Sequence, residues 1–87
     1  PDYVALMVEK IRTNWEGRPE VAGQVVVKYT IQRDGTIVNA SIEKQSGYTA
    51  LDFGSLRAVV GTRQFLPLPA AFPNPSLTVH LHFDYRR

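Results

Sequence analysis

Two histidines, His80 and His82, are the side chains whose spacing most readily suggests chemistry in this 87-residue chain. On a β-strand they would project from one face, about 6–7 Å apart, where imidazoles could act as two metal ligands or as a pH-sensitive patch. Asp84 on the same strand and Glu43 across a sheet are the remaining candidates for oxygen ligands. Polar side chains on a strand face are usually solvated, so we expect no metal site and no other cofactor.

No other group of residues matches a known catalytic arrangement. The chain has no cysteine, which excludes disulfides, thiolate zinc sites and cysteine nucleophiles. A serine nucleophile needs a base and an oxyanion stabiliser held beside it, and no such arrangement is recognisable around Ser46, Ser55 or Ser76. There is no evident carboxylate pair and no glycine-rich phosphate loop. We therefore expect a protein that is not an enzyme.

Charge and aromatic placement argue against a nucleic-acid partner. Ten basic and eight acidic residues leave a formal net charge of +2, a weak attraction for a polyanion. An RNA-binding sheet would expose aromatic side chains for base stacking, whereas Tyr29, Phe83 and Tyr85 fall on the strand faces that we assign to the core. A small metal- or nucleic-acid-binding module remains the alternative from another functional class.

Length and hydropathy indicate a single domain over residues 1–87. No apolar run approaches the roughly 20 residues that a membrane-spanning helix needs. The sequence starts at Pro1 without an initiator methionine or a signal-peptide pattern. We expect a piece of a longer protein, with any anchor or targeting signal upstream.

The first predicted element is an amphipathic helix over residues 3–15. Asp2 can cap its start, and Gly17 followed by Pro19 can end it. We expect Trp15 to be a core anchor rather than a ligand-binding residue. The apolar stripe consists of Val4, Val8, Ile11 and Trp15, with Met7 beside it.

A second helix is predicted from Thr49 to Thr62, after a capping box formed by Thr49 and Asp52. The connector over residues 65–76 then holds four prolines among apolar residues. It could be a polyproline II ligand, but we expect an ordered crossover packed on the edge of the domain. The apolar stripe of the helix consists of Phe53, Leu56, Val59 and Val60.

Between the helices, alternation with period two predicts a hairpin of strands 24–32 and 36–44 around Asp34-Gly35. We expect a two-residue loop that pairs Arg33 with Thr36, because this register keeps apolar residues opposite one another. The expected pairs are Ile31 with Val38, Tyr29 with Ala40, and Val27 with Ile42 on one face, and Lys28 with Ser41 and Val26 with Glu43 on the other.

The last strand, over residues 77–85, has the clearest alternation. The resulting order of helix, strand, strand, helix and strand predicts an α+β fold, in which a three-stranded antiparallel sheet carries both helices on one face. The apolar row of the last strand is Leu77, Val79, Leu81, Phe83 and Tyr85, and its polar row is Thr78, His80, His82 and Asp84.

This last strand is also the candidate binding site. It has no proline or glycine and no lysine or arginine before Arg86. If it lies at an edge of the sheet, its unpaired main-chain groups can accept an extended peptide by strand addition. The candidate partner-binding residues are Leu77, Thr78, Val79, His80, Leu81, His82, Phe83, Asp84 and Tyr85.

The order of several short motifs resembles the C-terminal domain of the TonB/TolA family of periplasmic energy transducers. Where typical TonB domains carry Tyr-Pro before the first strand, this chain has Arg18-Pro19, and its longer first helix is similar to the TolA-type or broader TonB-like subgroup. The matching motifs are the helix from Tyr3 to Asn14-Trp15, the strand from Gly23 with its turn at residues 34–37, Ser46-Gly47 before Leu51-Asp52, residues 56–59, residues 65–69 and the final strand.

The resemblance implies a periplasmic domain of an inner-membrane-anchored protein in a Gram-negative bacterium. An upstream membrane helix and Pro-rich spacer would connect the domain to inner-membrane motor proteins. The last strand, residues 77–85, would take up a short extended peptide from the plug of an outer-membrane transporter and so couple energy to transport. The alternative is a TolA-like role in envelope integrity with periplasmic Tol partners, and a homodimer formed by strand exchange is a further expectation.

Overall fold

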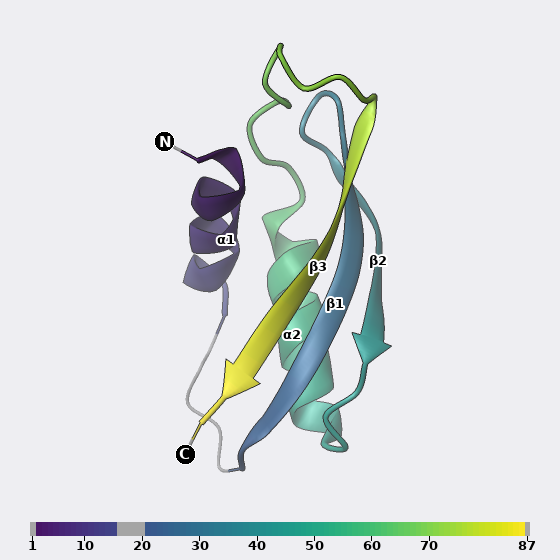
Figure 1. Cartoon of the computed structure of the whole chain (residues 1–87). Helices are drawn as coiled ribbons and strands as arrows, with labels where there is room; N and C mark the ends of the chain where they lie inside the picture. Colours follow the sequence, from purple (N-terminus) through teal and green to yellow (C-terminus); the bar gives the residue numbers. More distant parts are fainter. Residues whose placement is uncertain (1, 16–20, 87) are drawn as a thin grey trace.

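The computed structural model describes residues 2–15 and 21–86, which form two helices and three strands. In chain order these are α1 (Tyr3–Thr13), β1 (Gly23–Gln32), β2 (Ile37–Lys44), α2 (Thr49–Thr62) and β3 (Ser76–Tyr85). The strands form one antiparallel sheet in the order β2-β1-β3. Both helices lie on the same side of this sheet (Figure 1). The predicted α+β fold is confirmed. No helix among the described residues is long and apolar enough to cross a membrane.

The core lies between the sheet and the two helices. The hydroxyl of Tyr29, in the central strand β1, donates to the sulfur of Met7 in α1 at 3.6 Å. Burial, together with the nearby Tyr3, raises the pKa of Tyr29, so its hydroxyl stays neutral in the core. The apolar residues with no exposed surface are Met7, Ile11, Val25, Val27, Tyr29, Ile31, Ala58 and Val59.

Helix α1 buries Ile11 and Met7 as predicted, but its core-facing side does not include Val4. Met7 and Ile11 are fully buried, whereas Val4 of the predicted stripe is 41 % exposed. The reason is Tyr3, whose ring packs edge-on against Phe65 with centroids 5.2 Å apart. Tyr3, Met7 and Ile11 are four residues apart and share one side of the helix. Anchoring Tyr3 therefore rotates Val4 toward solvent.

The capping of α1 can be compared with the prediction at its start but not at its end. Asp2 is the N-cap, as predicted, and its carboxylate accepts a hydrogen bond from the N–H of Val4 at 2.9 Å. The helix ends at Thr13. The predicted helix end at Gly17 lies outside the described residues.

Helix α2 packs through smaller residues than predicted. Phe53 and Val60, from the predicted stripe, are 57 % and 52 % exposed. The hydroxyls of Ser55 and Thr62 donate to carbonyls one turn earlier in the helix, so these residues are buried without an unsatisfied group. Their small side chains let the helix lie close to the sheet. The buried residues of α2 are Leu51, Ser55, Ala58, Val59 and Thr62.

The start of α2 also differs from the predicted capping box. Tyr48 is the N-cap and makes no side-chain capping bond. Asp52 instead accepts hydrogen bonds from the N–H and the hydroxyl of Ser46, at 2.9 and 2.8 Å. The carboxylate therefore ties the loop after β2 to the first turn of α2.

The hairpin loop has three residues rather than the predicted two. Gln32 donates to the carbonyl of Thr36 at 2.9 Å, and the N–H of Gly35 donates to the carbonyl of Gln32 at 2.8 Å. Gly35 has a positive φ of 93°, whereas Asp34 does not, and a single left-handed glycine suits a three-residue loop. The Asp34 carboxylate accepts from the N–H of Thr36. This bond lowers the pKa of Asp34.

The longer loop shifts the pairing register of β1 and β2 by one residue. Two bulges in β2 then change the register again. Next to the loop, Ile31 pairs with Ile37 rather than with Val38, and Thr30 pairs with Val38. Asn39, with a φ of 56°, then forms a bulge with Ala40 opposite Tyr29. Beyond this bulge the predicted pairs Val27–Ile42 and Lys28–Ser41 are present. A second shift places Val26 opposite Lys44 rather than Glu43.

The proline-rich connector is an ordered crossover, as expected. The guanidinium of Arg33 donates to the carbonyls of Pro69, Phe72 and Asn74, and Leu68 is buried. These bonds hold the crossover against the hairpin loop, so that β3 enters the sheet beside β1.

Candidate functional site

Strand β3 is a regular edge of the sheet. It pairs with β1 through ten consecutive residue pairs, from Gly23–Tyr85 to Gln32–Ser76, without a bulge. On its other side it has no strand neighbour among the described residues (Figure 1). An uninterrupted edge of this kind is suited to pairing with another strand.

Strand β2 forms the opposite edge and is less suited to such pairing. It carries two bulges, which twist an edge and interrupt its row of main-chain groups. At its start, the N–H of Ile37 donates to the carbonyl of Arg63 at 2.9 Å. The segment after α2 therefore covers part of the β2 edge, and β3 is the more accessible of the two.

The hydrogen bonds of the hairpin indicate which groups of β3 face outward. Both main-chain groups of Gln32 point toward β2, and this direction alternates along a strand. Ile31 and the odd-numbered residues before it therefore point toward β3, where Leu77 and the odd-numbered residues after it are their partners. The main-chain N–H and C=O groups that remain for the free edge belong to Thr78, His80, His82 and Asp84.

The two side-chain rows of β3 lie as predicted. The polar row, Thr78, His80, His82 and Asp84, is exposed on the face of the sheet that carries no helix. The apolar row points toward the helices, with Leu77, Val79 and Leu81 half-buried and Phe83 and Tyr85 buried. The same four residues thus offer both free main-chain groups and exposed polar side chains.

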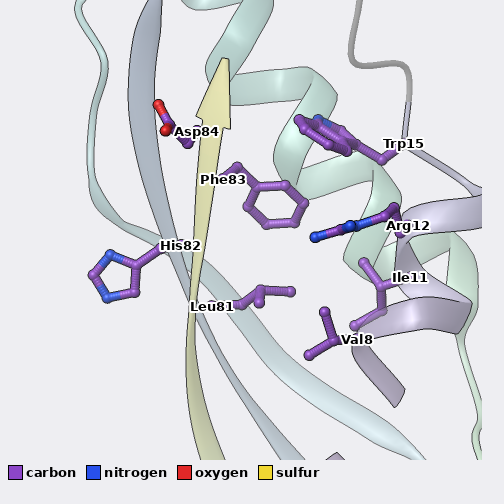
Figure 2. A pocket seen from close by; sticks show the side chains of 8 residues that line it. All are labelled: Val8, Ile11, Arg12, Trp15, Leu81, His82, Phe83 and Asp84. Carbon is purple, nitrogen blue, oxygen red and sulfur yellow. The ribbon is translucent and has the colours of Figure 1, made fainter. Parts of the chain in front are cut away.

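A groove lies between the C-terminal half of β3 and helix α1 (Figure 2). Its volume is about 140 Å³. The side chains of Leu81 and Phe83 point across it toward α1, whereas His82 and Asp84 point the other way (Figure 2). The residues that line the groove are Val8, Ile11, Arg12, Trp15, Leu81, His82, Phe83 and Asp84.

The contribution of α1, and of Trp15 just after it, to this groove was not predicted. Trp15 packs edge-on against Phe83 and Tyr85, with centroids 5.6 and 5.2 Å apart, which confirms its role as an aromatic anchor. The same residue also lines the groove. Val8 and Arg12 carried no local signal for such a role, because their positions are equally typical of any amphipathic surface helix.

The histidine pair lies on the open face of the sheet. Nδ1 of His80 is 2.9 Å from Oε1 of Glu43, so this carboxylate does reach the strand, as considered from the sequence. Asp84 is engaged by Arg86 at 2.8 Å instead. Within residues 2–15 and 21–86, no cluster of three or more potential metal ligands was found.

Comparisons with known proteins agree with this architecture. The family model for the TonB C terminal matches residues 1–83. Protein TonB of Pasteurella multocida (strain Pm70) is 42 % identical over 52 residues, which are 60 % of this chain and 20 % of that protein. The chain thus spans about one fifth of the curated relative it matches.

Two solved structures share the fold. One NMR solution structure of the Helicobacter pylori TonB C-terminal domain superposes with a TM-score of 0.73 and 17 % identity, covering 99 % of this chain and 95 % of that one. A second, of a longer piece of the same domain, has a TM-score of 0.67 and 21 % identity, with coverages of 98 % and 84 %.

Proposed function

Because this chain belongs to the TonB C-terminal domain family, we propose that it is the interaction domain of a TonB-like energy transducer. Its partner is an outer-membrane transporter, and an extended segment of the transporter plug adds as a fourth strand to β3. The observation that carries this proposal is the edge itself: ten unbroken pairs with β1 and a free outer side. Residues 77–85 form the contact surface.

Strand addition gives this contact a specific energetic character. The free N–H and C=O groups of alternate β3 residues supply several hydrogen bonds, each worth about 1 kcal/mol net. Together with modest apolar burial, this corresponds to an affinity near the micromolar range. Such a contact can hold while several hydrogen bonds share a pull along the strand, and its modest affinity lets the partners dissociate after a cycle.

The cellular context of this proposal concerns a protein longer than the chain described here. We propose that residues 1–87 form one periplasmic domain of an inner-membrane-anchored protein. Upstream segments would connect the domain to inner-membrane motor proteins, which supply the energy. The domain itself has a non-enzymatic role, in which it transmits force through a protein contact.

The experiment is an amide-shift NMR titration of the domain with short extended peptides from transporter plugs. We expect shifts in residues 76–85 and in the paired residues of β1. Thr78→Pro removes an outward N–H without touching the apolar row and should weaken the peptide binding that these shifts report about fivefold or more. Thr78→Ala, which keeps the N–H, is the matched control and should bind like the unchanged domain.

The outcomes separate the proposal from its alternative. Unchanged peptide binding by a folded Thr78→Pro variant would refute docking of the peptide near residue 78. Binding of a Tol protein, with no response to any transporter peptide, would favour the TolA-like role. The edge is also open to a second copy of the domain, so the titration uses protein concentrations at which sedimentation shows a monomer.

A further inference from the structure

A strand that adds along β3 must place the side chains opposite Leu81 and Phe83 beside the groove next to α1. Directly opposed residues of neighbouring strands project from the same face of a sheet. Leu81 and Phe83 project toward α1 (Figure 2), so the added residues opposite them do so too. An apolar cavity of about 150 Å³ can hold a benzene-sized molecule. The groove, at about 140 Å³, therefore has room for one side chain of an added strand.

The groove contains one charged group that extends from α1 toward β3. The guanidinium of Arg12 reaches across the groove in the direction of Phe83 (Figure 2). Among the described residues, the ion pairs are His80–Glu43 and Arg86–Asp84, and neither includes Arg12. The guanidinium of Arg12 thus faces the groove (Figure 2) without an ion-pair partner from residues 2–15 or 21–86.

Among the described residues, three carboxylates near the groove or on α1 do not supply this partner. Asp84 points away from the groove (Figure 2) and is held by Arg86. Asp2 caps the first turn of α1. Glu9, the remaining acidic residue of α1, is exposed and forms no ion pair within the described residues. Within residues 2–15 and 21–86 no carboxylate meets Arg12 in the groove, and an added strand can supply one.

The side chains that point into the groove beside Arg12 are apolar, and they follow a defined order along the molecule (Figure 2). Helix α1 and strand β3 run in the same direction along the molecule (Figure 1). Val8 consequently lies toward Leu81, and Arg12 one turn later lies toward Phe83 (Figure 2). Two neighbouring positions of the groove thus differ in chemistry, one aliphatic and one cationic.

We propose, on the premise that strand addition to β3 occurs, that Arg12 makes the groove selective for an acidic side chain. The preferred segment carries Glu or Asp opposite Phe83 and an aliphatic residue two positions away, opposite Leu81. A glutamate suits the site because its methylene groups lie along apolar surface while its carboxylate meets the guanidinium.

The test uses synthetic seven-residue peptides in which threonine alternates with valine and the central valine is replaced by glutamate. This pattern reads the same in both directions, so the strand orientation does not matter. A second peptide has glutamine at the centre, and a third has the glutamate moved by one position, onto the threonine face. We expect the first peptide to bind about fivefold more tightly than the other two.

Variants of the domain test whether Arg12 causes the preference for the central-glutamate peptide. Arg12→Gln should weaken the central-glutamate peptide about fivefold and leave the glutamine peptide within about twofold. Arg12→Lys should retain part of the preference because it keeps the charge. Arg57→Gln is the matched control, since it removes the same charge from the exposed side of α2 and should leave the preference intact.

The failures of the two proposals are distinguishable. If peptides shift residues 76–85 but Arg12→Gln weakens all of them equally, strand addition stands and selection by Arg12 is wrong. Equal binding of the three peptides to the unchanged domain would overturn the selection in the same way. If no peptide shifts the β3 residues, strand addition itself is wrong and the selection is excluded with it.

Discussion

The hydroxyl oxygens of Ser55 in α2 and Tyr85 in β3 lie 2.8 Å apart in the buried interface between helix and sheet. Ser55 donates to the carbonyl of Leu51 at 2.9 Å, which leaves its oxygen to accept from Tyr85. The ring of Tyr85 also packs edge-on against Trp15. The last residue of β3 is therefore held by α2 and by Trp15, which follows α1, so the C-terminal end of the free edge is fixed in place.

Removing the hydroxyl of Tyr85 should measurably lower the stability of the domain. We expect Tyr85→Phe to lower the free energy of unfolding by about 1 kcal/mol, the net value of a typical buried hydrogen bond. Urea denaturation measures this difference. Tyr48→Phe is the control because Tyr48 is 47 % exposed and should cost nearly nothing. Equal effects of the two substitutions would mean that the hydroxyl pair does not stabilise β3.

Substitutions at two glycines can distinguish the cost of backbone strain from the cost of steric contact. Gly35 and Gly47 have almost the same φ, 93° and 94°, but only Gly35 lies against the crossover. A Cβ on Gly35 would collide with the carbonyl of Phe65, whereas one on Gly47 would meet no atom within 4 Å. Gly47→Ala should cost about 1 kcal/mol from the backbone alone, and Gly35→Ala clearly more. Similar losses in urea denaturation would contradict the close contact between loop and crossover.

Asp34 should make the hairpin sensitive to acid. The hydrogen bond from the N–H of Thr36 lowers the pKa of Asp34 in the folded protein. The stabilisation is therefore present above the pKa of the unfolded chain, near 4, and is lost as pH falls through the lower folded pKa. We expect the stability difference between the unchanged protein and Asp34→Asn to shrink over this acidic range. A difference that does not change with pH would show that the carboxylate charge contributes nothing.

The side-chain rows of β3 could be predicted because they depend on local geometry alone. Successive residues of any strand point to opposite faces, so Leu81 and His82 had to lie on different sides wherever the strand was placed. The family was likewise predicted from the order of short motifs, and the match over residues 1–83 confirms it. Neither inference requires knowledge of how distant segments meet.

The register of the hairpin could not be predicted from the local sequence alone. Asp34-Gly35 suits loops of two or three residues, and the apolar pairing pattern favoured the shorter one. The folded chain uses the longer loop and restores the pairing with the left-handed Asn39. The glycine that allows the loop also meets the crossover around Phe65, a contact between segments that are distant in sequence.

The sequence by itself thus determined the class of each element, the two faces of the last strand and the family. Tertiary structure decided which side of each helix is buried, which edge of the sheet stays regular and what lies beside that edge. The groove needs Arg12 from the start of the chain and Phe83 from its end. Hydropathy patterns describe only neighbours along the chain, whereas this site exists because packing of the core brings its two ends together.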